Sequence, residues 1–183
     1  MKTKHKFIIA SAVAAIAAGI WFLLFSYNPA LLTYKNGLFR YTVRYPASFT
    51  VSDIGGGGIV SFISPRSNEN DIFFESINII VQNFGSNSLT LNQYYKATRE
   101  ALEEPTSSTK VAQVKKIRLK NKQEAYALLF STLERGVFAK CLQTIFVHRN
   151  KGYIITYVAM PDEFERYVAD ARLITNSFRL LDR

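Results

Sequence analysis

Cysteine, histidine and tryptophan are scarce in this chain of 183 residues. The single cysteine, Cys141, excludes an intrachain disulfide and any Cys-x-x-Cys metal or redox motif. The two histidines are His5, in a basic N-terminal stretch, and His148, at the end of a predicted strand. A zinc site needs three or four nitrogen or sulfur ligands, so His148 and Cys141 alone do not make one. We therefore expect neither a metal nor another cofactor.

Motifs that would indicate an enzyme are also missing. No Gly-x-Ser-x-Gly nucleophile elbow accompanies His148. Acidic residues occur singly, apart from Glu103-Glu104 and Asp162-Glu163 at the ends of predicted helices, where a structural role explains them. The glycines at 55–58 precede a predicted strand rather than a helix, which favours a flexible hairpin loop over a phosphate-binding loop. The residues thus make no positive case for an enzyme.

Charge is absent from residues 7–25, a run of nineteen residues. A helix rises about 1.5 Å per residue, so this run would span roughly 28 Å, close to a bilayer core. A cleaved signal peptide is the alternative, but its apolar region is usually shorter and ends in small residues. This run ends in aromatic residues, which suit the membrane interface. We expect a cytoplasmic tail and anchor in 1–26, a linker in 27–33, and a domain in 34–183 on the extracytoplasmic side.

Residues 110–160 predict four consecutive antiparallel strands, a β-meander. They consist of runs rich in β-branched and aromatic residues, separated by tight turns. We expect a two-residue turn at Arg135-Gly136 and a three-residue turn ending in a left-handed Gly152. The turns fix the register, and the expected pairs are Phe130 with Cys141, Leu129 with Leu142, Val147 with Ile155, and Ile145 with Tyr157.

Two helices are expected beside this sheet. Thr90 and Gln93 match a capping box, which begins a helix over residues 90–104. Pro161 stands at the first position of a second helix, over residues 161–176. Asn36-Gly37 matches a type I′ hairpin turn ahead of an alternating strand. No strand-helix-strand alternation is present, so the fold class is α+β with a central antiparallel sheet rather than α/β.

Two groups of residues are candidate binding surfaces. Tyr94 and Tyr95 are candidate surface aromatics for stacking, although their helical spacing also fits core packing. Lys116, Arg118 and Lys120 alternate with apolar residues and are predicted to share one face of a strand as a docking face. Lysines that protect a solvated edge strand from aggregation are the structural alternative. Of the formal net charge of +9, three charges belong to lysines ahead of residue 7, and the remaining +6 of the domain suggests a membrane or another anionic surface as partner. Nucleic acid is not expected outside the membrane.

The order of the elements resembles the PsbP-like family. A strand pair ending in Tyr45-Pro46-x-x-Phe49 leads through further strands to the capped helix, the meander, and a helix closing in Ser177-Phe178. The resemblance covers residues 32–180 and departs from the family where Phe49 replaces the usual tryptophan and where the lipobox cysteine of many bacterial members is absent. It implies an α-β-α sandwich and a non-enzymatic domain that docks on, or helps to assemble, a membrane protein complex.

Two other functions fit the same sequence features. One is a membrane-anchored subunit of a secretion or envelope machine, with a domain in which helices pack on a curved sheet. Such a domain usually has its long helices before the meander, unlike this sequence. The other is a small-ligand-binding domain, which would need a cavity between the sheet and the helices lined by tyrosines.

Overall fold

The structure is a computed structural model that describes residues 29–54, 58–66, 68–69, 71, 73–105, 107–134 and 136–181. The predicted anchor in 7–25, its signal-peptide alternative and glycines 55–57 lie outside the described residues. No helix among the described residues has the length and apolar content needed to cross a membrane. A compact unit begins at Leu31, and it holds every strand and helix described below.

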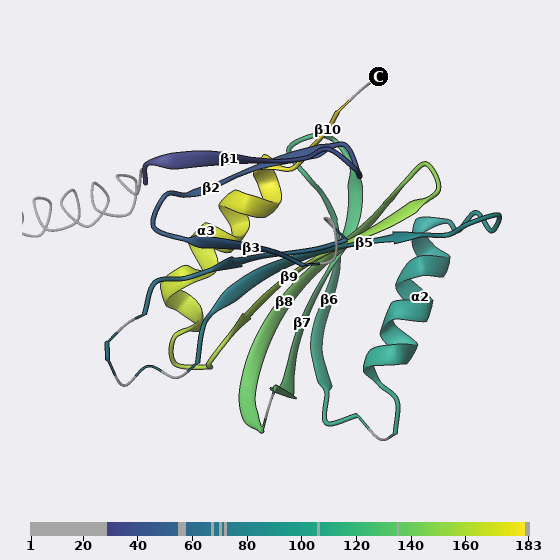
Figure 1. Ribbon diagram of the computed structural model, residues 1–183. Helices are drawn as coiled ribbons and strands as arrows, with labels where there is room; N and C mark the ends of the chain where they lie inside the picture. The colour runs from purple at the N-terminus through teal and green to yellow at the C-terminus, as the bar shows by residue number, and fades with distance from the viewer. Residues whose placement is uncertain are drawn as a thin grey trace, which may run out of the picture. The chain divides into compact units, whose positions relative to one another are not determined.

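Strands dominate this unit (Figure 1). The elements in chain order are β1 (Leu31–Asn36), β2 (Tyr41–Pro46), β3 (Thr50–Ile54), β4 (Ile59–Ile63), β5 (Ser76–Asn83), α2 (Leu91–Leu102), β6 (Lys110–Arg118), β7 (Glu124–Glu134), β8 (Val137–His148), β9 (Lys151–Ala159), α3 (Phe164–Ser177) and β10 (Arg179–Leu180).

The strands form two antiparallel sheets. Seven lie in the order β3-β4-β5-β9-β8-β7-β6, and the smaller sheet has the order β1-β2-β10. The meander from β6 to β9 and the antiparallel pairing predicted from the sequence are therefore confirmed. The small sheet was not predicted, because the two-residue strand β10 is too short to leave a periodic pattern.

One helix lies on each side of the seven-stranded sheet (Figure 1). Successive side chains along each strand point to opposite faces of the sheet, so each strand contributes to the packing on both sides. On one face, Tyr94 of α2 packs in a core with Leu128 and Phe130 of β7 and with residues of β8. On the other, α3 joins a core built from β5, β9 and the small sheet, with Tyr157 and Phe178 fully buried.

The register of the meander agrees with the prediction at one hairpin and differs at the other. Phe130 pairs with Cys141 and Leu129 with Leu142, as expected. The β8–β9 pairing is shifted from the prediction, because its turn has two residues, Arg149 and Asn150, rather than three. The observed pairs are Val147 with Gly152, Ile145 with Ile154, Thr144 with Ile155, and Leu142 with Tyr157.

The position of Gly152 explains this error. It lies inside β9, and Arg149 takes the left-handed conformation in the turn, with a φ of 53°. The ring of Tyr94 packs directly against Gly152, and a Cβ there would lie 2.7 Å from Cε1 of the ring. The glycine is thus required by close approach of a side chain rather than by turn geometry.

Several predicted boundaries also move. β1 begins at Leu31, inside the predicted linker, because residues 31–33 pair with the end of β2. The turn after Asn36 has four residues rather than two, and Asn36 Oδ1 accepts a hydrogen bond from Phe39 N at 2.8 Å. The capping box at Thr90 is confirmed. α3 begins at Phe164, because residues 161–163 form a turn.

The short motifs that carried the family resemblance have structural roles. Phe178 is 0% exposed and stacks on Tyr41 with 4.9 Å between ring centroids. Ser177 Oγ accepts a hydrogen bond from Arg44 N at 2.8 Å, which connects the end of α3 to β2. Phe49 packs edge-on against Tyr167 of α3. These residues connect the small sheet, α3 and the large sheet.

Candidate functional site

The two helices leave different parts of the large sheet uncovered. α2 lies over β7 and β8 on one face, and α3 lies along β9 and the small sheet on the other. A pocket of about 260 Å³ opens between α3 and strands β6, β7 and β8. A second hollow of about 510 Å³ lies on the opposite face over β3, β4 and β5, where Phe73 and Phe74 contribute to its lining.

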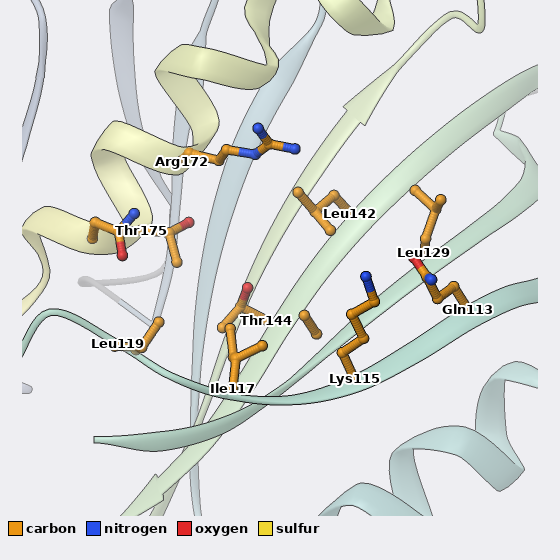
Figure 2. Close-up of a pocket in the computed structure, with 11 residues that line it drawn as sticks. Gln113, Lys115, Ile117, Leu119, Leu129, Leu142, Thr144, Arg172 and Thr175 are labelled. Carbon is orange, nitrogen blue, oxygen red and sulfur yellow. The ribbon is translucent and has the colours of Figure 1, made fainter. Parts of the chain in front are cut away.

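The smaller cavity, here called the α3 pocket, combines an apolar floor with two cations (Figure 2). The residues that define it are Ile117, Ala127, Leu129 and Leu142 in the floor and Lys115 and Arg172 at the rim. Figure 2 shows the Arg172 side chain extending from α3 and the Lys115 amine pointing into the same space, with Leu142 between them. Thr144 and Thr175 add hydroxyl groups to the lining.

A β-bulge in β6 brings Lys115 to this pocket. Pairing with β7 shifts between Val111 and Gln113, which adds one residue to β6. Val111 and Val114 consequently both pack on the α2 side, whereas Gln113 and Lys115 line the α3 pocket. Without the bulge, strand alternation would place Val111 and Lys115 on the same face.

One end of the pocket is fixed by the β6–β7 turn. Leu119 is buried, and its backbone N donates a hydrogen bond to Gln123 O at 2.9 Å. Asn121 Nδ2 donates to Phe178 O at 3.3 Å and so joins the turn to the residue that follows α3. The pocket is therefore bounded by connected elements rather than by an isolated loop.

The charges at the rim are uncompensated within the described part of the chain. Neither the Lys115 amine nor the Arg172 guanidinium has an ion pair or hydrogen bond there, whereas the amine of the neighbouring Lys116 pairs with Glu124 at 3.2 Å. Lys115 and Arg172 at the rim are exposed, whereas the four floor residues are half-buried. The arrangement places positive charge beside apolar surface that water reaches.

The predicted docking face lies partly as expected. β6 is an edge strand of the large sheet, and Lys116 and Arg118 are exposed on it, on the side opposite Ile117. Lys120 is also exposed, but β6 ends at Arg118, so strand alternation does not place Lys120 with the other two. The residues after Arg118 form the turn into β7, in which Lys122 adopts a left-handed conformation with a φ of 67°.

The prediction of a surface aromatic is wrong for Tyr94. This side chain is 4% exposed, and its hydroxyl donates a hydrogen bond to Gln82 Oε1 at 2.7 Å. Burial raises the pKa of Tyr94 to about 12. Tyr95 is half-buried and stacks on Tyr126 with 4.2 Å between centroids. The helical stripe therefore serves packing against the sheet, as its spacing also allowed.

Sequence reasoning missed the α3 pocket. A cavity lined by tyrosines was expected for a ligand-binding domain, whereas none of the pocket's lining residues is a tyrosine. Lys115 could have been predicted to face away from the docking face, because neighbouring residues of a strand point to opposite faces and Lys116 is the next residue. Arg172 gave no such signal, since a basic residue on the polar side of a helix is ordinary. Within the described residues, no cluster of three or more histidine, cysteine or acidic residues could hold a metal ion.

Comparison with solved structures defines the class of fold. The cyanobacterial PsbP of Synechocystis is similar with a TM-score of 0.59 and 17% identity, covering 85% of this chain and 95% of that protein. LpqN of Mycobacterium tuberculosis, described as involved in cell envelope biogenesis, has a TM-score of 0.63 and 13% identity, covering 84% and 91%. PA94 of Pseudomonas aeruginosa, of unknown function, has a TM-score of 0.58 and 16% identity, covering 84% and 97%.

These likenesses give the chain a PsbP-like fold. No protein-family model matches the sequence. No curated protein matches it either. At such low identity the structural similarity concerns the fold alone, and the function has to be argued from the residues of this chain.

Proposed function

We propose that this chain is a non-enzymatic domain, tethered to the membrane on its extracytoplasmic side, that docks on or helps to assemble a membrane protein complex. In this proposal Lys116, Arg118 and Lys120, here called the cationic edge, contact the anionic membrane surface. The PsbP-like fold, shared with a protein of cell envelope biogenesis, supports a role at the envelope. The charge-free run at 7–25 supports the tether.

The observation that carries the proposal is the position of the cationic edge. Five of the eight residues at 115–122 are lysine or arginine, and β6 is an edge strand of the large sheet. The ion pair with Glu124 partly neutralises Lys116, so Arg118 and Lys120 are expected to contribute most. Each lysine or arginine near an anionic bilayer adds about 1 kcal/mol of binding free energy.

A short tether keeps the domain close enough for such contact. Only the five positions 26–30 separate the apolar run from β1. A fully extended chain covers at most about 3.5 Å per residue, so these positions span no more than ~18 Å. The anchor would therefore hold the cationic edge at high local concentration near lipid, and weak contacts would suffice.

Vesicle co-sedimentation tests the cationic edge. The compact unit from Leu31 contains both cores, so the fragment 29–183 can be used without the anchor. We expect it to bind vesicles with anionic phosphatidylglycerol more strongly than neutral phosphatidylcholine vesicles, and less as salt increases. Lys116→Gln, Arg118→Gln and Lys120→Gln together should weaken binding about 30-fold to 150-fold, because two to three residues contribute about 1 kcal/mol each.

A second triple variant controls for net charge. Lys35, Arg44 and Lys96 are exposed on other elements, and their replacement by glutamine removes the same charge. Equal loss of binding in the two triple variants would mean that only total charge matters. Binding of the first variant equal to wild type would reduce the cationic edge to a solvated strand edge, the structural alternative.

A further inference from the structure

Two cations from different elements converge on the α3 pocket (Figure 2). Lys115 belongs to β6 and Arg172 to α3, and neither has an ion-pair partner among the described residues. Like charges that face a common space repel one another, and an anion bound between them would relieve that repulsion. The rim is thus suited to an anionic group.

The apolar floor of the pocket favours a ligand that carries an apolar group beside its anionic group. Leu129 and Leu142 pair across β7 and β8, well inside the sheet, yet both are only half-buried. On the same face, Ala125 of β7 and Phe146 of β8 are fully covered. Because α3 does not cover this part of the sheet, apolar side chains remain in contact with water, and a ligand that displaced the water would gain free energy.

Size limits the ligand further. Pockets for drug-sized molecules run from about 300 to 1,000 Å³, and the α3 pocket has about 260 Å³. A nucleotide cofactor or both chains of a phospholipid would exceed this volume. Besides the two cations, the hydroxyls of Thr144 and Thr175 and the amides of Gln113 and Asn176 add hydrogen-bonding positions around the apolar floor.

We propose that the α3 pocket binds a small soluble amphiphilic anion, with a carboxylate or comparable oxyanion between Lys115 and Arg172 and a short apolar body on the floor. A simple inorganic anion would leave the apolar floor exposed to water, and a neutral apolar molecule would leave both cations unpaired. This site is separate from the cationic edge, because Lys115 lies on the face of β6 opposite Lys116.

Calorimetric titration of the fragment 29–183 tests the proposal with three probes. Octanoate, below its aggregation concentration, carries both the anion and the apolar body, octanamide is its neutral counterpart, and acetate lacks the chain. We expect saturable binding of octanoate at one site, at least tenfold weaker binding of octanamide, and no saturable binding of acetate. Equal affinity for octanoate and octanamide would overturn the role of the cations. Acetate binding as strong as octanoate binding would overturn the role of the floor.

Variants assign the binding to the pocket. Lys115→Gln with Arg172→Gln should weaken octanoate binding at least tenfold, and Ala127→Leu, which fills the floor, should weaken it with the charges unchanged. The control is Lys116→Gln with Arg118→Gln, which removes the same charge from the opposite side of β6 and should leave octanoate binding unchanged. Unchanged binding in the first double variant would place the site elsewhere, for instance in the hollow over β3, β4 and β5.

Two further measurements keep the outcome interpretable. Circular dichroism of each variant establishes that it is folded, and nuclear magnetic resonance shifts of the Leu129 and Leu142 methyl groups report occupancy without depending on heat. A membrane lipid is the other source of the same chemistry. Vesicle binding that requires Lys115 and Arg172, without any octanoate binding by the wild type, would overturn the proposal of a soluble ligand.

Discussion

Gly152 has the space of a hydrogen atom and no more. The Tyr94 ring lies against it, and the hydroxyl of Tyr94 is held by Gln82 of β5. A Cβ at Gly152 would lie 2.7 Å from two atoms of Tyr94, Cε1 and the hydroxyl oxygen. Because α2 is anchored through this tyrosine, the contact determines how closely the helix approaches β9.

We therefore expect Gly152→Ala to destabilise the fold by about 1–3 kcal/mol, the usual cost of overpacking a core. Gly37→Ala is the matched control, because a Cβ at Gly37 meets nothing within 4 Å. Urea unfolding midpoints measure both effects. Equal midpoints for the two variants would contradict the close packing of Tyr94 on β9.

Glu75 is a second residue with an unusual environment. It is 1% exposed, its Oε2 accepts a hydrogen bond from Ser64 Oγ at 3.3 Å, and its Oε1 has no hydrogen-bond partner among the described residues. Burial, with a smaller effect of the Asp71 carboxylate, raises the pKa of Glu75 above its ordinary value. The folded protein thus holds this proton more tightly than the unfolded chain does.

The direction of the pH effect follows from this difference. The stability contributed by protonated Glu75 is fully present below its unfolded pKa and is lost as the pH rises through the raised folded pKa. Glu75→Gln should therefore be more stable than wild type at pH 7, with the difference shrinking toward pH 4. The measurement is the free energy of unfolding at both pH values, with the exposed Glu100→Gln as control. A Glu75→Gln difference that does not change with pH would refute the burial argument.

Two glycines show that the role of a residue can be predicted from sequence when it depends on local geometry, but not when it depends on a distant side chain. Gly136 was correctly predicted as a turn residue, because its role is local and its φ is 80°. Gly152 was misinterpreted, because its role depends on Tyr94, which is distant in the sequence. The capping box of Thr90 and Gln93 was predicted for the same reason as Gly136, since all of its hydrogen bonds lie within one turn.

At the scale of elements, one hydroxyl group links α3 to the backbone of β2, in addition to the apolar packing between them. Ser177 Oγ accepts a hydrogen bond from Arg44 N at 2.8 Å and lies 2.8 Å from Ile174 O, to which it can donate. The serine therefore satisfies a backbone group of β2 and the last turn of α3 at once. β1 and β10 use other backbone groups of the same strand.

We expect Ser177→Ala to cost about 1–3 kcal/mol, because it leaves a part-buried backbone N–H without its partner. Ser131→Ala, at an exposed position of β7, should have little effect. Chemical denaturation gives the difference, and faster hydrogen exchange of the Arg44 amide would localise it. Indistinguishable unfolding of the two variants would rule out a stabilising role for the hydroxyl.

The bulge in β6 illustrates a limit of prediction at this scale. Alternation correctly separated Lys116 and Arg118 from Ile117, yet the extra residue between Val111 and Gln113 left no pattern in the sequence. A bulge depends on the pairing with β7, so it requires knowledge of the register. It also distorts the edge of the sheet, which together with the lysines discourages pairing with another chain.

At the scale of the whole unit, the sequence indicated the layers but not their lateral placement. Amphipathic stripes predict that each helix turns its apolar side to the sheet. They do not specify which strands lie beneath it, and this decides where the sheet stays uncovered. The α3 pocket and the hollow over β3, β4 and β5 exist because α3 and α2 cover different strands on opposite faces.

The long-range contacts of the small sheet also bear on the order in which the parts of the protein fold. Ser177 and Arg44 are 133 positions apart in the sequence, whereas the meander pairs only strands that follow one another. Joining distant segments loses chain entropy before any contact compensates for it, so such pairings form late. We therefore expect the meander to fold early, and the contacts of α3 and β10 with β2 to form late. We expect the same contacts to open before the meander in the native protein, which would release α3 from the sheet that it covers.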